Sequence, residues 1–279
     1  MKDKLILVIK GFFFGIANII PGVSGGTIAI TMGVYEEMID IISHFFKDLR
    51  KSLNFLIPFG IGAIISILVM SKLISFCLDK YPFPTTLFFM GLIIGGIPLL
   101  TKKVKNSKIK PINIILFLLT FSLIIGMAFM KEGNNVVSLS NMNMGMYIIL
   151  FLVGMIAAAT MVIPGVSGSF VLMLLGFYKP IVNTVSKLTD FSLLGNNLAI
   201  LIPFGLGVVM GIVLVAKVLE YLFNHYEVST YYAILGFIIA SIFTLGYSLF
   251  GVNISIIQVL IGIILFIIST FIGYKLGDE

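Results

Sequence analysis

Two short stretches carry residue types that can bind an anion without a charged side chain. Pro21-Gly22-Val23-Ser24-Gly25 recurs as Pro164-Gly165-Val166-Ser167-Gly168, each time inside an apolar run. Glycine permits tight backbone turns, and a serine can cap the helix that follows it. Past such a cap, free amide groups and the positive end of the helix dipole attract phosphate. The residues expected to bind substrate at these two tips are Asn18, Pro21, Gly22, Val23, Ser24, Gly25, Gly26, Thr27, Pro164, Gly165, Val166, Ser167, Gly168 and Ser169.

Two lysines are further candidates for binding the same anion. Lys72 and Lys217 each lie late in a long apolar segment. A lysine inside a membrane commonly faces a pathway, because its exposure to lipid is costly. The alternative is that each long side chain extends to the nearby interface and binds no substrate. The sequence leaves both interpretations open.

Three acidic residues follow the first tip and are candidates for ion coupling. Glu36 and Asp40 share one helical face, and Glu37 lies beside them. They could carry a coupling proton or bind a cation, or they could form a solvated acidic rim at the cytoplasmic interface. No Cys/His cluster has metal-ligand spacing and no Walker-type loop occurs, so we expect no metal site and no cofactor.

The composition places these candidates in a membrane. Of the 279 residues, 59% are hydrophobic and 11% are charged, and apolar runs of membrane length recur along the whole chain. We therefore expect an all-α polytopic membrane protein. The net charge of +6 resides largely in lysine-rich loops at 47–51 and 101–110. Such loops normally lie in the cytoplasm and set membrane orientation, so they do not indicate nucleic-acid binding.

The chain contains one unit twice. Besides the two tips, a Gly-x-Tyr sequence ends at Tyr35 and again at Tyr178, and "LIPFGIGAII" from Leu56 is answered by "LIPFGLGVVM" from Leu201. Such an ordered series of matches indicates a duplication. We expect a first repeat at 1–130, an extracytoplasmic connecting loop at 131–144 and a second repeat at 145–279.

The segment lengths predict that the two repeats are inverted. Each repeat has five apolar segments, at 5–20, 24–45, 53–79, 84–100 and 111–130, and at 145–163, 167–188, 198–223, 230–250 and 253–274. Only ten residues separate Lys10 from Pro21, which is about 15 Å of helix or half of the ~30 Å hydrocarbon core. We expect each tip to turn a re-entrant hairpin, followed by three transmembrane helices. An odd number of crossings inverts the second repeat, as in secondary transporters, and places both termini in the cytoplasm.

The doubled motif resembles a known family. The PGVSGG and PGVSGS tips, each followed by Gly-x-Tyr, are similar to those of the PopT family of bacterial polyprenyl-phosphate translocases, and the resemblance extends from about Lys10 to the C-terminus. It implies a multi-pass plasma-membrane protein that carries undecaprenyl phosphate from the outer to the cytoplasmic leaflet, recycling the lipid carrier of wall synthesis. The second copy departs after the tyrosine, where Lys179-Pro180 replaces Glu36-Glu37. Any role of those acids is therefore not symmetric.

Two other functions were compared with lipid transport. A membrane phosphatase acting on polyprenyl pyrophosphate also uses a Pro-Gly-x-Ser turn, but that turn continues with an arginine, and here Arg50 is the chain's one arginine. Hydrolysis would lack its clamp and its acid/base pair, so we expect no enzymatic activity. A secondary transporter or channel for a small anion could use the same tips, and the sequence separates it poorly from a lipid transporter.

Overall fold

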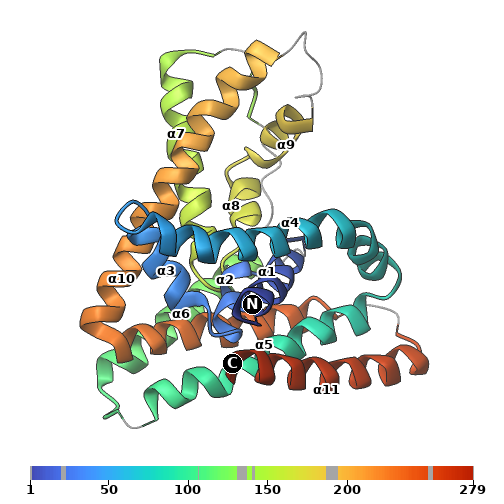
Figure 1. Ribbon diagram of the computed structural model, residues 1–279. Coiled ribbons are helices and arrows are strands. Elements are labelled where there is room, and N and C mark those ends of the chain that lie inside the picture. Colours follow the sequence, from blue (N-terminus) through green and yellow to red (C-terminus); the bar gives the residue numbers. More distant parts are fainter. Residues whose placement is uncertain are drawn as a thin grey trace.

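The protein is helical throughout the part described by this computed structural model, which covers residues 2–19, 23–105, 107–130, 137–139, 142–186, 194–250 and 254–278 (Figure 1). The first half contains α1 (Lys2–Ile19), α2 (Gly25–Thr31), α3 (Tyr35–Ser43), α4 (Leu49–Lys80), α5 (Pro82–Val104) and α6 (Pro111–Phe129). The second half contains α7 (Met144–Val162), α8 (Gly168–Leu174), α9 (Tyr178–Ser186), α10 (Leu194–Tyr247) and α11 (Ile256–Asp278).

The 54-residue helix α10 consists of two helices joined at a kink. Its backbone leaves helical geometry at Tyr226, where φ is −136° and ψ is 40°. Tyr81, which separates α4 from α5, has nearly the same geometry, with φ of −135° and ψ of 55°. The first part of α10 therefore corresponds to α4 and the second part to α5. The sequence predicted two segments here, and the structure joins them.

The helices have the length and surface of a multi-pass membrane protein. Six of them, within the described residues, are long and apolar enough to cross a bilayer, and the bent pair α8–α9 would make a seventh span. The most apolar stretch of each of these helices is largely exposed. In α6, for example, only 17% of this stretch is buried inside the protein. Apolar side chains on an outer surface indicate contact with lipid. The predicted class, an all-α polytopic membrane protein, is confirmed.

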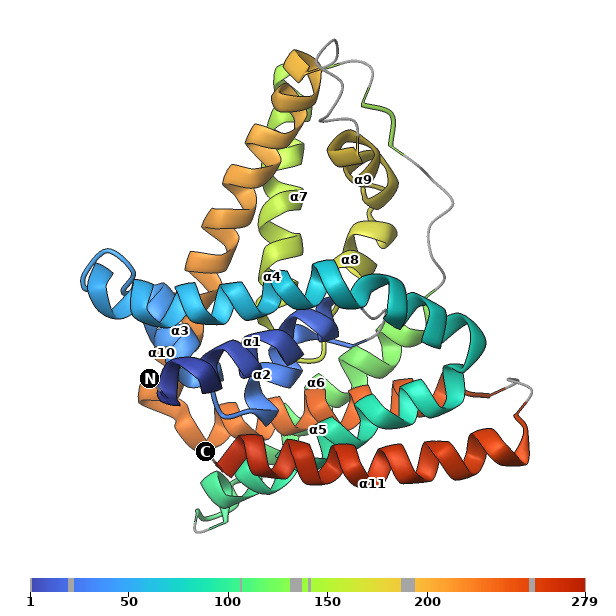
Figure 2. The same cartoon turned by 45° about the vertical axis from the view of Figure 1, so that its right-hand side comes forward.

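The two tips lead into the middle of the molecule. In both views α2 lies centrally, with α1 and α4 on one side and α5 and α11 on the other (Figures 1 and 2). Helix α7 stands beside the first part of α10, and the N- and C-terminal ends lie near each other. Residues of α2 such as Thr27 and Ile28 are fully buried, so the first tip is enclosed by protein instead of lipid.

The Gly-x-Tyr sequence ends the short helix after each tip. Gly33 and Gly176 have positive φ values of 68° and 77°, which glycine adopts without the steric cost that a side chain adds. The next amide bonds back to the helix, from Val34 N to the Ala29 carbonyl and from Phe177 N to the Leu172 carbonyl. The apolar segments 24–45 and 167–188 each contain two short helices joined at this turn, and α8 and α9 are bent by 115° relative to each other.

The first arm of the first hairpin is longer than predicted. Helix α1 has 18 residues, so it is not the half-membrane arm that the distance from Lys10 to Pro21 suggested, whereas α7, with 19 residues, agrees with the expected segment 145–163. The prediction took Lys10 as the end of the helix. In the structure Lys10 lies in the middle of α1 and is buried against the rest of the protein. The turns at the tips remain, between α1 and α2 and between α7 and α8.

Matched glycines let the first arm of each half approach its partner helix. A Cβ added at Gly62 of α4 would overlap the Val8 carbonyl oxygen of α1, and one at Gly207 of α10 would overlap the Phe151 carbonyl oxygen of α7. Gly62 and Gly207 occupy the same place in the two predicted repeats. Small residues at such contacts allow membrane helices to pack closely. We infer that both halves use one packing unit, while their opposite orientation in a membrane stays a prediction.

The close approach of α7 and α10 gives a stability prediction. Gly207→Ala should lower the free energy of unfolding by about 1–3 kcal/mol, because the new methyl group overlaps backbone. Gly205 lies two residues before Gly207 in α10, and a Cβ added there meets nothing within 4 Å. Gly205→Ala should therefore leave the free energy of unfolding unchanged or raise it by roughly 0.5–1 kcal/mol. Thermal unfolding of both purified variants in detergent measures the difference. Equal melting temperatures would contradict the packing described here.

Candidate functional site

The two tips meet and enclose a small cavity. Its volume is about 70 Å³, and we call it the tip cavity. It is lined by Asn18, Val23, Ser24, Gly25, Met161, Val166, Ser167, Gly168 and Ser169. A few water-sized groups fit in this volume. The lining offers hydroxyl, amide and backbone groups and, among these residues, no charged side chain.

The tips are joined by direct contacts. The Gly165 amide donates a hydrogen bond to Thr27 Oγ1 over 2.8 Å, and a Cβ added at Gly26 would lie 3.0 Å from the Val162 carbonyl oxygen. The Tyr35 hydroxyl donates to that same carbonyl over 2.9 Å. Irregular backbone inside a membrane protein requires such partners, because lipid offers none. These contacts fix the second tip against α2 and α3.

The serines at the helix starts differ in their hydrogen bonding. Both Ser24 and Ser167 hold the extended backbone of an N-cap residue, as expected. Ser167 Oγ accepts from the Phe170 amide at 3.4 Å and lies 2.9 Å from Ser169 Oγ. Ser24 makes no side-chain cap bond, and its buried Oγ has no hydrogen-bond partner in the part of the chain that the structure describes. An unpaired buried hydroxyl is costly, so a ligand oxygen that bonds to it gains that free energy.

Several expected binding residues lie outside the tip cavity. Gly26, Thr27, Pro164 and Gly165 hold the tips together and are not part of its lining. Pro21 and Gly22 fall outside the described residues. The Thr27 hydroxyl oxygen accepts the bond from the Gly165 amide, and its role as a donor to the substrate stays a prediction.

The two candidate lysines do not gain support from the structure. Lys217 is exposed on α10 and lies outside the lining of the tip cavity. Lys72 lies in α4, but its side chain is outside the described part. A role for either in binding the anion stays a prediction. Glu220, one turn after Lys217, contacts His44 Nε2 at 3.4 Å.

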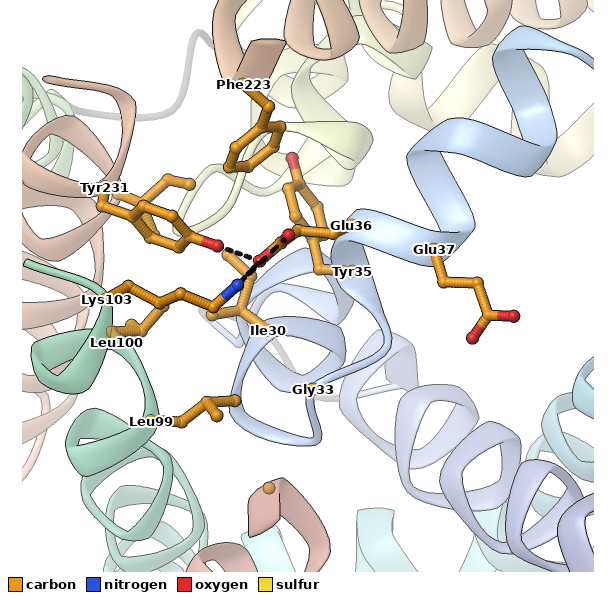
Figure 3. Close-up of a pocket in the computed structure, with 12 residues that line it drawn as sticks. Ile30, Gly33, Tyr35, Glu36, Glu37, Leu99, Leu100, Lys103, Phe223 and Tyr231 are labelled. Atoms are coloured by element: carbon orange, nitrogen blue, oxygen red, sulfur yellow. Dashed lines mark hydrogen bonds and ion pairs between the residues drawn. The ribbon is translucent and has the colours of Figure 1, made fainter. Parts of the chain in front are cut away.

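The three acids after the first tip have separate surroundings. Glu36 Oε1 lies 3.1 Å from Lys103 Nζ, and Asp40 Oδ2 lies 2.8 Å from Lys51 Nζ. Glu37 is exposed and points away from Glu36 and Lys103 (Figure 3). The hydrogen bond from Lys51 holds the pKa of Asp40 below its usual range, although partial burial opposes this shift. Asp40 is therefore charged at neutral pH and is poorly suited to carry a proton.

One cluster has the residue types of a metal site. The ligand atoms of Asp40, His44 and Glu220 lie within 4.8 Å of one another, a proximity that the sequence did not predict because α3 and α10 are far apart along the chain. His44 Nδ1 lies 3.3 Å from Asp40 Oδ1. Since Lys51 already balances the charge of Asp40, the geometry supports a network of ion pairs between the two halves.

Lys103 and Tyr231 form a polar site that sequence reasoning missed. Lys103 was expected in a lysine-rich loop, but α5 continues to Val104 and places it on the last helical turn. There it contacts Glu36, and the Tyr231 hydroxyl donates a hydrogen bond to the same carboxylate. No pattern in the sequence pairs these residues, which come from α5, α3 and α10.

Comparison with known proteins gives consistent matches over most of the chain. Residues 14–248 match a family model described as undecaprenyl phosphate translocase-like. A polyprenyl-phosphate transporter of Staphylococcus aureus (strain NCTC 8325 / PS 47) is 32% identical over 278 residues, which cover 98% of this chain and 96% of the relative. A polyprenyl-phosphate transporter of Vibrio cholerae serotype O1 is 30% identical over 239 residues, covering 81% and 72% respectively. No solved structure matches the chain significantly.

The unequal serines give a second stability prediction. Ser167→Ala should lower the free energy of unfolding by about 1 kcal/mol, because the Phe170 amide loses its cap. Ser24→Ala should change it by less than about 0.5 kcal/mol or raise it slightly, since it removes a buried hydroxyl without a partner. Thermal unfolding of the two purified variants gives the comparison. A larger loss in Ser24→Ala than in Ser167→Ala would contradict the assigned hydrogen bonds.

Proposed function

The chain belongs to the undecaprenyl phosphate translocase-like family, and from that membership we propose that it moves undecaprenyl phosphate from the outer to the cytoplasmic leaflet of the bacterial plasma membrane. It is a multi-pass membrane transporter and not an enzyme. Both named relatives are polyprenyl-phosphate transporters, which supports a polyprenyl phosphate as the lipid substrate. Movement of this carrier to the cytoplasmic face would return it for another round of wall-polymer synthesis.

The tip cavity is the proposed site of the phosphate headgroup, and the unpaired hydroxyl of Ser24 carries the proposal. Ser24 lines the cavity from the first tip, where its buried Oγ has no partner among the described residues, and Ser167 and Ser169 line it from the second tip. Phosphate oxygens accept hydrogen bonds from hydroxyl and amide groups at helix starts. Helices α2 and α8 have seven residues each, so local donors contribute more than a long helix dipole would.

The apolar tail is proposed to stay outside the tip cavity. About 70 Å³ accommodates a headgroup but not a long isoprenoid chain. An almost wholly apolar groove of about 460 Å³ lies between α5 and α11, with Pro98, Phe266 and Phe271 among its walls. An open apolar groove lets a tail contact the protein and lipid together, which a lipid carrier requires and a carrier of inorganic ions does not.

Orientation and coupling are proposed from charge. The lysine-rich end of α5 and the loop after it would face the cytoplasm, and the chain termini would lie on the same side. Asp40 is paired with Lys51 and Glu36 with Lys103, so a coupling ion carried by the three acids would bind at Glu37 or displace one of these lysines. Passive transport remains compatible with the same site.

Transport of a small anion is the second candidate function, because the same donors would bind inorganic phosphate. Proteoliposomes that contain fluorescent polyprenyl phosphate and external inorganic phosphate separate the two. The proposal predicts that the protein equalises lipid accessibility between leaflets without phosphate uptake. Phosphate uptake without lipid movement would establish the anion transporter instead.

Removal of one hydroxyl tests the headgroup site. Ser24→Ala should slow lipid translocation about tenfold or more, because a hydrogen bond to a charged group contributes roughly 1.5–3 kcal/mol. Ser248→Ala, which removes a hydroxyl bonded to the Leu245 carbonyl at the far end of α10, is the matched control and should keep the original rate. The assay is leaflet accessibility in proteoliposomes with equal amounts of folded protein. An unchanged rate in Ser24→Ala would refute headgroup binding at the tip cavity.

A further inference from the structure

A second and larger cavity lies at the other end of α2. Its volume is about 370 Å³, and we call it the Lys103 pocket (Figure 3). Elements α2, α3, α5, α10 and α11 all contribute to it, through residues that include Gly33, Glu36, Lys103, Phe223, Tyr231 and Gly277. Glu36, Lys103 and Tyr231 form a polar cluster in this pocket, and the exposed side chain of Glu37 also belongs to its lining.

Lys103 and Tyr231 together form an anion-binding pair. The Lys103 ammonium and the Tyr231 hydroxyl both point at the Glu36 carboxylate (Figure 3), and Lys103 Nζ also lies 5.5 Å from the centre of the Tyr231 ring. The ring of Tyr231 is buried and packs against Phe223 at 5.5 Å between centroids. The phenol is therefore held in place before any ligand arrives, which limits the entropy lost on binding.

We propose that the Lys103 pocket is a second station for the phosphate headgroup, at which a phosphomonoester replaces the Glu36 carboxylate on Lys103 and Tyr231. This inference rests on the proposed function and adds a binding site to it. Glu36 then acts as an internal substitute for the substrate, holding the cation and the phenol in position until a phosphate arrives.

The resident ion pair is of the kind that a phosphate can displace. The side chains of Lys103 and Glu36 retain 40% and 50% of their exposure, and exposed ion pairs are weak. A phosphomonoester carries a charge of about −1.5 to −2 at neutral pH and more acceptor oxygens than a carboxylate. The phosphate therefore carries more negative charge than the Glu36 carboxylate with which it competes for Lys103 and Tyr231. The displaced Glu36 side chain can turn toward water.

Helix α2 connects the Lys103 pocket to the tip cavity. Ser24 and Gly25 at its start line the tip cavity, and Ile30 and Gly33 at its end line the Lys103 pocket. Seven helical residues span only about 10 Å. A headgroup leaving the tips thus has a second anion site within a short distance, near the end of the protein proposed to face the cytoplasm.

Glu36 is also linked to the second tip. Its neighbour Tyr35 donates a hydrogen bond to the Val162 carbonyl, just before that tip. Displacement of Glu36 at the start of α3 would act on Tyr35, one of the residues that join the first half to the second tip. Occupation of the pocket and opening of the tip cavity can be coupled through this single contact.

Binding measurements on charge variants test the pocket. The variants are Glu36→Gln, Lys103→Gln and their combination, each in a Ser24→Ala background that weakens the tip cavity. A short-chain polyprenyl monophosphate and inorganic phosphate are titrated separately into purified protein in detergent. Lys105→Gln removes a neighbouring charge outside the pocket lining and is the matched control, and thermal unfolding verifies that every variant is folded.

The pocket predicts opposite effects of its two charges. Glu36→Gln should bind the lipid phosphate about threefold or more tighter, because the competing carboxylate is gone. Lys103→Gln and the double variant should bind it about tenfold more weakly, and Lys105→Gln should match the background. Weaker or unchanged binding in Glu36→Gln would overturn the proposal, as would unchanged binding in Lys103→Gln.

The same titrations separate this proposal from the proposed function. If only inorganic phosphate responds to the substitutions, the pocket serves a free anion and the lipid station is refuted. If the original protein translocates the lipid while all charge variants bind alike, only the second station fails. If the original protein neither binds nor translocates the lipid, the proposed function fails first.

Discussion

The contact between the two tips is the constraint on which the rest of the structure depends. Each half interrupts its helices inside an apolar protein, and every interruption frees backbone groups that lipid cannot satisfy. The structure meets this requirement by placing the interruptions against each other, so that Thr27 accepts from the Gly165 amide and Tyr35 donates to the Val162 carbonyl. Gly62 and Gly207 allow the helix that leads into each tip, α1 or α7, to pack closely against α4 or α10. The tip cavity is the space that this arrangement leaves between the tips.

Composition and the lengths of the apolar runs were sufficient to predict the helical membrane class, and the duplicated motif predicted the residues that line the tip cavity with the exception of Met161. The repeated Pro-Gly-Val-Ser-Gly motif identifies Ser24 and Ser167 as helix starts because local backbone chemistry determines that role. The same reasoning could have predicted the breaks at Gly33 and Gly176, since glycine before a new helix commonly takes positive φ.

Other features depend on contacts between distant segments, which one sequence does not reveal. Thr27 accepts a bond from a residue 138 positions away, so its hydroxyl could not be assigned from spacing. Lys103 looked like one of several loop lysines, and only the fold brings it to Glu36 and Tyr231. Lys10 was taken to mark a helix end because charge usually lies at an interface, but it is buried within α1. For both lysines, the position of the charge in the sequence did not predict where the side chain lies in the fold.

The two halves share their packing but not their charges, so the proposed pathway is unequal at its two ends. Tyr178 is followed by Lys179 where Tyr35 is followed by Glu36, so the acid that faces the Lys103 pocket has no counterpart in the second half. A symmetric headgroup site with a station on one side would bind the phosphate differently at the two membrane faces. The most direct test of the account is a structure of the protein bound to a polyprenyl monophosphate in a lipid nanodisc. The account predicts phosphate density between residues 23–25 and 166–169, within hydrogen-bonding distance of Ser24 Oγ. Density for the phosphate outside both the tip cavity and the Lys103 pocket, with the tips still in contact and Ser24 unpaired, would contradict it.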